Sequence, residues 1–253
     1  MSPALRIVGL GDSLTEGVGD PRRGRAGFAR QLDGWLSYVA AAIRSSGQPV
    51  EVRNFATAGA RLEHVVDHQL PLARMEPADI IACFIGINDL WDTNLDLDEF
   101  GQRFHSLFGE LASKAPTVMT ASIHDVFAPF PVRAPLRQKL QRTIATMNDV
   151  IGAAVIDHGL VLIDLAGRPE LFTSAVRAVD RLHPNRYGHQ LIAAEVIHRL
   201  HDRDRFLDVE PPVAVPVRRG TQDLAHIAWV SGYVRHNWKR WRAEMRDNRT
   251  SSD

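Results

Sequence analysis

The chain has 253 residues, of which 45% are hydrophobic and 24% charged, and these proportions exclude disordered, collagen-like and disulfide-scaffold proteins. Thirty Lys and Arg balance thirty Asp and Glu, so the chain lacks the strong positive charge of a dedicated nucleic-acid-binding protein. Its single cysteine, Cys83, lies inside an apolar run and permits no internal disulfide. The first ten residues do not have the pattern of a signal peptide, and no stretch reaches 18 apolar residues. We therefore expect a cytoplasmic protein with no transmembrane segment.

Short apolar runs alternate along the chain with longer segments of helical period. The expected strands cover residues 5–10, 50–55, 79–87, 117–123 and 160–164, and the expected helices cover 28–46, 61–74, 97–114, 136–158 and 186–201. This alternation predicts an α/β fold in which helices cover both faces of a parallel sheet. In such sheets ligands bind beyond the carboxyl ends of the strands, so we expect the functional residues in the loops that follow these five runs.

The pattern changes after residue 205. Pro211, Pro212 and Pro216 predict a connector over residues 206–220, because proline does not continue a helix. Residues 221–253 then combine an aromatic stripe with a basic one, which predicts an amphipathic helix. We expect this helix to dock on the preceding domain, residues 1–205. Contact with an anionic membrane surface or with a partner protein is the alternative.

The first expected strand leads into Gly11-Asp12-Ser13-Leu14, which places Ser13 on a tight turn at the carboxyl edge of the sheet. This is an exposed position for a nucleophile, although the same residues also form ordinary turns. A serine needs a base that takes its proton. Asp180 and His183 meet this need, because an aspartate three residues before a histidine can reach the imidazole Nδ1 and leave Nε2 for a hydroxyl. The alternative for this segment is a polar turn in which Pro184 starts the next helix.

Two further strand ends offer hydrogen-bond donors for an oxyanion. Gly59 follows the second expected strand, and its missing side chain lets a backbone N–H approach a ligand closely. Asn88 follows the third expected strand, and its side-chain amide can donate. Each residue also has a structural alternative, a turn at Gly59 and an Asx-turn at Asn88.

Taken together, these four blocks resemble those of the SGNH hydrolase superfamily, the GDSL esterases and lipases. The resemblance covers residues 5 to about 201. It implies a three-layer αβα fold of flavodoxin-like type with a five-stranded parallel sheet. It also implies Ser13 as nucleophile, His183 as general base and then acid, and Asp180 as the residue that orients His183. The backbone N–H groups of Ser13 and Gly59 and the side chain of Asn88 would form the oxyanion hole.

The activity that the resemblance implies is hydrolysis of a carboxylic ester of a small or acylated substrate, with neither an organic cofactor nor a metal. An acyltransferase that uses the same acyl-enzyme, or an interaction module that acts through the C-terminal helix, remains an alternative. The expected partner is a small-molecule ester and not a nucleic acid. The sequence leaves the oligomeric state and the acyl chain length open.

Three weaker patterns have two readings each. The apolar, Pro-rich loop 124–132 is expected either to line an acyl pocket or to pack as a surface loop. The segment 16–27 is a solvated loop or a mobile basic rim that contacts an anionic substrate. His64 and His68 stand one helical turn apart, which favours a solvated helix face over a metal site because no further ligand motif accompanies them.

Overall fold

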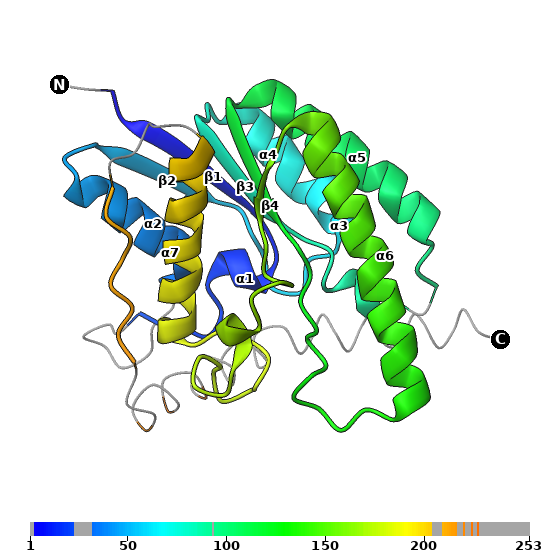
Figure 1. Ribbon diagram of the computed structural model, residues 1–253. Helices are drawn as coiled ribbons and strands as arrows, with labels where there is room; N and C mark the ends of the chain where they lie inside the picture. The colour runs from blue at the N-terminus through cyan, green and yellow to red at the C-terminus, as the bar shows by residue number, and fades with distance from the viewer. Residues whose placement is uncertain are drawn as a thin grey trace.

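The computed structural model describes residues 3–22, 32–92, 94–203 and 209–216, together with the single residues 220, 224 and 227. Five strands form one sheet in the order β2-β1-β3-β4-β5, and all neighbouring pairs are parallel (Figure 1). The strands are β1 (Leu5–Gly11), β2 (Val50–Asn54), β3 (Ile80–Phe84), β4 (Thr117–Ala121) and β5 (Val161–Ile163). This is the flavodoxin-like strand order, whose switch point lies between β1 and β3. The predicted fold class and all five predicted strands are confirmed.

Helices cover both faces of the sheet (Figure 1). One face carries α2 (Gly34–Ser45) and α7 (Arg186–Arg203), and the other carries α3 (Leu62–His64), η1 (Val65–Gln69), α4 (Leu70–Met75), α5 (Leu97–Lys114) and α6 (Ala134–His158). Each face has its own cluster of buried apolar side chains, which makes the three layers. Strands β3 and β4 are buried along their whole length because both of their faces are covered, and this explains their continuous apolar sequences.

Short turns connect the sheet to these helices at its carboxyl edge. They are α1 (Ser13–Glu16) after β1, η2 (Asp89–Trp91) after β3 and η3 (Pro169–Phe172) after β5. Strand β3 ends earlier than expected, at Phe84, and Gly86 follows with a φ of 116°. A left-handed backbone does not continue a strand, so the chain turns here toward Asn88.

Two predicted helices differ from the observed ones. The segment 28–46 yields a helix only from Gly34, because Leu32 pairs with Pro21 and the N–H of Asp33 donates to the carbonyl of Asp20. Residues 28–31 lie outside the described part of the chain. The segment 61–74 is divided into α3, a π-helical turn η1, and α4. Pro71, at the start of α4, has no N–H to donate, and the N–H of Leu70 bonds five residues back to Val65.

The C-terminal region is described in part. Residues 209–216 contain no helix or strand, and the N–H groups of Val209 and Val215 donate to His201 and Gln190 of α7. The expected helix 221–253 lies outside the described residues, apart from Leu224 and Ile227. The boundaries 1–205, 206–220 and 221–253 therefore remain predictions. No helix in the described ranges is both long enough and apolar enough to cross a membrane.

Candidate active site

The turn that carries Ser13 is built by its neighbours in sequence. Gly11 ends β1 with a φ of 116°, and a Cβ at this position would lie 2.1 Å from the carbonyl oxygen of Phe84. Asp12 caps α1 by accepting the N–H of Leu14 at 2.9 Å. Ser13 is the first residue of α1, so its own N–H has no partner within that helix. The turn thus presents both the hydroxyl and the N–H of Ser13 at the carboxyl edge of the sheet.

The π-helical turn η1 supports this arrangement from the neighbouring layer. The side-chain amide of Gln69 is buried and makes two hydrogen bonds to the backbone of Gly11. It accepts the N–H of Gly11 at 2.7 Å and donates to the carbonyl of Gly11 at 2.8 Å. Both polar ends of a buried amide are thereby satisfied, which fixes the residue two places before Ser13. Gln69 was not among the predicted site residues, because nothing in the helical periodicity indicates a π turn.

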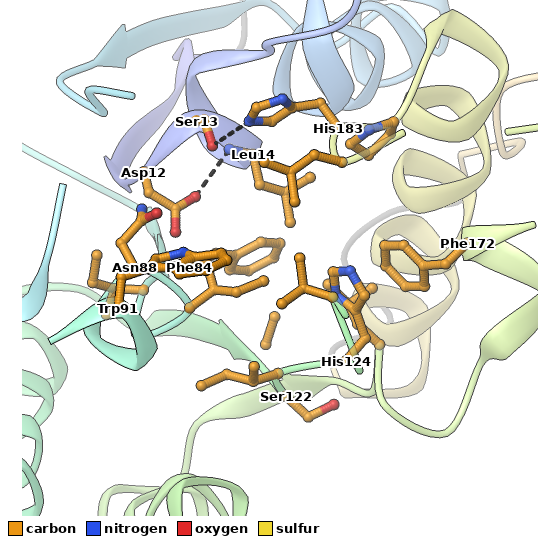
Figure 2. Close-up of a pocket in the computed structure, with 18 residues that line it drawn as sticks. Asp12, Ser13, Leu14, Phe84, Asn88, Trp91, Ser122, His124, Phe172 and His183 are labelled. Carbon is orange, nitrogen blue, oxygen red and sulfur yellow. Dashed lines mark hydrogen bonds between the residues drawn. The ribbon is translucent and has the colours of Figure 1, made fainter. Parts of the chain in front are cut away.

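Ser13, His183 and Asp180 lie in a continuous hydrogen-bonded line. His183 Nε2 is 2.9 Å from Ser13 Oγ, although the two residues are 170 positions apart in the chain (Figure 2). His183 Nδ1 is 2.8 Å from Asp180 Oδ2. Because a carboxylate only accepts hydrogen bonds, Nδ1 donates its proton to Asp180, and Nε2 is left to accept the proton of the Ser13 hydroxyl.

The loop that holds His183 is fixed by its backbone. The second oxygen of Asp180, Oδ1, accepts the N–H groups of Leu182 at 2.9 Å and of His183 at 3.0 Å. The carbonyl of His183 accepts the N–H of Ala178 at 2.8 Å. Gly19 packs closely against this loop, since a Cβ at Gly19 would lie 1.9 Å from the carbonyl oxygen of Pro184. The imidazole is therefore held in place before any ligand binds.

The expected oxyanion donors lie on the loops that follow β2 and β3. Gly59 has a φ of 81°, and its N–H has no acceptor among the residues that the structure describes. Asn88 donates one amide hydrogen to the carbonyl of Ala60 at 2.9 Å. Its second amide hydrogen has no acceptor in the described part of the chain, and the side chain lines the same cavity as Ser13 (Figure 2). The N–H of Ser13 likewise has no hydrogen-bond acceptor among the residues that the structure describes. Gly59 and Asp180 do not belong to the residues that line the cavity.

Glu16 contacts the loop that carries Gly59, a contact that was not predicted from the sequence. Its Oε2 accepts the N–H of Ala58 at 2.6 Å, directly before Gly59. Burial raises the pKa of Glu16, while the Ala58 N–H and the nearby His183 oppose this rise. The expectation of a solvated or mobile loop over 16–27 is wrong for residues 16–21, which lie in α1 or are buried. The reason is tertiary: this segment is enclosed between β1, α2 and the His183 loop, while residues 23–27 lie outside the described part of the chain.

Two buried carboxyl groups adjoin the site: Asp12, which precedes Ser13 and lines the cavity, and Asp89, which follows Asn88. Burial raises the pKa of Asp12 to about 7; the N–H of Leu14 lowers it, and the negative charges of Asp89 and Glu16 raise it further. Burial likewise raises the pKa of Asp89 to about 6, against the N–H of Leu62 that this carboxylate accepts. Asp12 is therefore partly protonated near neutral pH.

A cavity of about 70 Å³ opens beside Ser13 (Figure 2). It is much smaller than the roughly 300–1,000 Å³ of sites for drug-sized ligands. Most of its lining is apolar. The lining residues are Asp12, Ser13, Leu14, Phe84, Ile85, Ile87, Asn88, Trp91, Ala121, Ser122, Ile123, His124, Val126, Leu165, Phe172, Leu182, His183 and Pro184.

The loop after β4 takes part in this cavity only at its beginning. His124 and Val126 line it, whereas residues 128–132 do not. Of the two alternatives for loop 124–132, lining a pocket therefore holds for two residues, His124 and Val126, and not for the rest of the loop. Trp91 and Phe172, which come from η2 and η3, also line the cavity and were not predicted as site residues. No sequence motif marks them, because they line one cavity only when the loops after β3 and β5 lie close together in the fold.

His64 and His68 are the two histidines that the sequence places one helical turn apart. Their rings lie 4.7 Å apart at an angle of 57°. Across the described ranges, no three His, Cys, Asp or Glu side chains come together in a geometry that could hold a metal ion.

The chain is similar to a curated protein and to several solved structures. The chain is 27% identical over 212 residues to a curated relative, the uncharacterised protein YpmR of Bacillus subtilis (strain 168). The aligned residues cover 75% of this chain and 79% of that protein. Among solved structures, the acetylxylan esterase Axe2 from Geobacillus stearothermophilus has a TM-score of 0.61 at 19% identity, over 78% of this chain and 94% of that one. A lipase/acylhydrolase from Enterococcus faecalis has a TM-score of 0.59 at 21% identity, over 83% of this chain and 100% of that one. These likenesses show the shared fold.

The family assignment rests on the sequence match and on the residues that the match contains. The model of the GDSL-like Lipase/Acylhydrolase family matches residues 10–191. This range includes Ser13, Gly59, Asn88, Asp180 and His183, the residues of the four blocks noted in the sequence. The chain belongs to the GDSL-like lipase/acylhydrolase family and is an SGNH-type serine hydrolase of carboxylic esters.

Proposed function

We propose that the protein hydrolyses carboxylic esters through a covalent acyl-enzyme on Ser13. The observation that carries this proposal is the line from Asp180 through His183 to Ser13, with distances of 2.8 and 2.9 Å. A serine hydroxyl becomes a strong nucleophile only when a base accepts its proton, and His183 Nε2 lies within reach of that proton.

In the first half-reaction Ser13 Oγ bonds to the ester carbonyl carbon while its proton moves to His183 Nε2. The carbonyl oxygen becomes an oxyanion, which the N–H groups of Ser13 and Gly59 and the free amide hydrogen of Asn88 stabilise. The C–O bond to the alcohol then breaks, and His183 returns the proton to the leaving alkoxide. Asp180 keeps the imidazole oriented and stabilises its charged form throughout.

In the second half-reaction water takes the place of the alcohol. His183 accepts a proton from the water while the water oxygen bonds to the acyl carbon. The bond between that carbon and Ser13 Oγ then breaks, and His183 returns the proton to Ser13 Oγ. The products are a carboxylic acid and an alcohol. If another alcohol replaces water, the same acyl-enzyme performs acyl transfer, and product analysis with an added acceptor alcohol separates the two activities.

The test combines labelling with mutation. A fluorophosphonate reacts with an activated serine, and we expect the modified peptide to contain Ser13. Ser13→Ala should abolish labelling and lower hydrolysis of p-nitrophenyl acetate by several orders of magnitude. Ser113→Ala, an exposed serine of α5, is the matched control and should retain both. Wild-type turnover by Ser13→Ala, or labelling at another residue, would contradict the proposal.

A further inference from the structure

Two stacked rings line the cavity on the side opposite Ser13. The rings of His124 and Phe172 lie 3.5 Å apart and are inclined by 10°. In Figure 2, Ser13 and His183 lie at one side of the cavity and the two rings lie across it. Phe172 is buried, with 7% of its surface exposed, and His124 is partly buried. A group that enters from Ser13 therefore meets an aromatic wall.

The loops that carry these two rings are fixed to the rest of the fold. Ser122 donates to Asp164 Oδ1 at 2.8 Å and accepts the N–H of Ala166 at 2.8 Å, which joins the loops after β4 and β5. From α6, the amide of Asn148 accepts the N–H of Ile123 at 2.7 Å and donates to its carbonyl at 2.9 Å. The residues directly before His124 are therefore held in place on both sides.

The wall also carries no charge near neutral pH. Burial of the His124 ring, together with the positive charge of Arg177, lowers its pKa to about 3. A neutral imidazole packed flat on a phenyl ring gives a surface suited to a methyl or methylene group.

The mouth of the cavity differs from this end. Trp91 is 55% exposed at the rim, with its ring edge-on to Phe127 at 4.9 Å. An alcohol must leave and water must enter while the acyl group stays on Ser13. The open side is therefore suited to the alcohol, and the enclosed apolar end to the acyl group.

We propose that the His124–Phe172 pair ends the acyl-binding cavity and restricts the enzyme to esters of short acyl groups, of acetyl to butyryl size. This proposal rests on the proposed function, because it requires an acyl group on Ser13. The cavity volume of about 70 Å³ leaves room for only a few non-hydrogen atoms next to the carbonyl.

The first experiment measures kcat/KM on p-nitrophenyl acetate, butyrate, octanoate and decanoate. The wild type should prefer acetate or butyrate over octanoate by at least about a hundredfold, because overfilling a fixed pocket is costly. Phe172→Ala should raise the octanoate-to-acetate ratio at least about tenfold, because each added methylene then finds space. His124→Ala, which removes the half-buried ring, should act in the same direction and provides the test if Phe172→Ala does not fold.

Phe130→Ala is the matched control, since Phe130 lies in the same loop as His124 and does not line the cavity. It should keep the wild-type ratio. Circular dichroism identifies the folded variants. Equal wild-type rates on acetate and decanoate would overturn the proposal, as would unchanged ratios in folded variants of both wall residues.

A second series keeps the acetyl group and enlarges the alcohol. The wall variants should leave the selectivity in this series unchanged. If they change selectivity for the alcohol and not for the acyl group, the cavity binds the alcohol and the proposal is wrong. Fluorophosphonates with short and long alkyl chains give the same comparison without turnover. Failure of the wall proposal leaves labelling at Ser13 intact, whereas failure of the proposed function removes it.

Discussion

The carboxylate of Glu16 accepts the N–H of Ala58 at 2.6 Å and so ties the nucleophile turn to the loop that carries Gly59. Glu16 lies three residues after Ser13 in the single turn of α1, so the two side chains share one side of that turn. The N–H of Gly59 therefore keeps its position relative to Ser13 through a carboxylate that does not itself line the cavity.

Replacing Glu16 should slow turnover more than it weakens substrate binding. We expect Glu16→Ala to lower kcat by about tenfold to a hundredfold with little change in KM, because a displaced oxyanion donor acts only in the transition state. Glu16→Gln keeps an acceptor oxygen and should restore most of the rate. Steady-state kinetics of the two variants measure this effect. A rise in KM at constant kcat, or equal losses in both variants, would contradict a positioning role.

Asn88 should contribute directly to the rate. Asn88→Ala removes one of the expected oxyanion donors and should lower kcat by about a hundredfold or more. Asn94→Ala, in the same connection between β3 and α5, is exposed and should keep the wild-type rate. Thermal unfolding of both variants separates a loss of rate from a loss of fold. Wild-type kcat in folded Asn88→Ala would remove this residue from the oxyanion hole.

Asp180 should be needed for the correct tautomer of His183. In Asp180→Asn the side-chain oxygen can still accept the N–H groups of Leu182 and His183, but the amide nitrogen then faces Nδ1 and favours the opposite tautomer. We expect kcat to fall by about a thousandfold to ten-thousandfold while the protein stays folded. Asp98→Asn, at an exposed position of α5, is the control. A loss of less than tenfold would contradict this role.

The buried carboxyl of Asp12 should make stability depend on pH. Its pKa rises from 3.8 to about 7 on folding, so the folded protein holds this proton more tightly than the unfolded chain. Stability is then lost as pH rises from about 4 to about 7, and the loss is of the order of 3–4 kcal/mol at about 1.4 kcal/mol per pKa unit.

Asp12→Asn removes this titration and keeps an oxygen for the N–H of Leu14. Urea unfolding of both proteins across the same pH range should show the variant gaining stability relative to the wild type as pH rises. Asp89 is present in both proteins, so its own titration largely cancels. A difference that does not change with pH would show that Asp12 is ionised in the folded state throughout this range.

His189 should contribute to stability and not to chemistry. Its fully buried ring donates from Nε2 to the carbonyl of Val18 at 2.9 Å and accepts the N–H of Trp35 at Nδ1 at 3.2 Å. His189→Ala leaves both backbone groups without this partner and opens a cavity, so we expect a loss of about 2–5 kcal/mol in urea unfolding. His198→Ala, exposed on the same helix, should cost less than about 0.5 kcal/mol. Equal losses in the two variants would contradict this account.

The fold could be predicted from local patterns to a large extent. The apolar run that became β3 and the amphipathic period of α5 (Leu97–Lys114) depend on residues that lie next to each other in sequence. The prediction failed where distant residues decide the backbone. The contact of Gly17 with Gly34 helps to set the start of α2, since a Cβ on Gly34 would lie 2.5 Å from Gly17 Cα.

The sequence by itself determined the parallel sheet and the candidate residues Ser13, His183 and Asp180. It also determined that the functional residues lie in loops after the strands, because a parallel sheet brings the carboxyl ends of its strands to one edge. Only the tertiary structure decided that Glu16 turns inward to Ala58 and that His124 stacks on Phe172 beside a small cavity. These contacts join loops with no shared period. Their geometry follows from how the helices pack on the two faces of the sheet, which no local pattern of residues records.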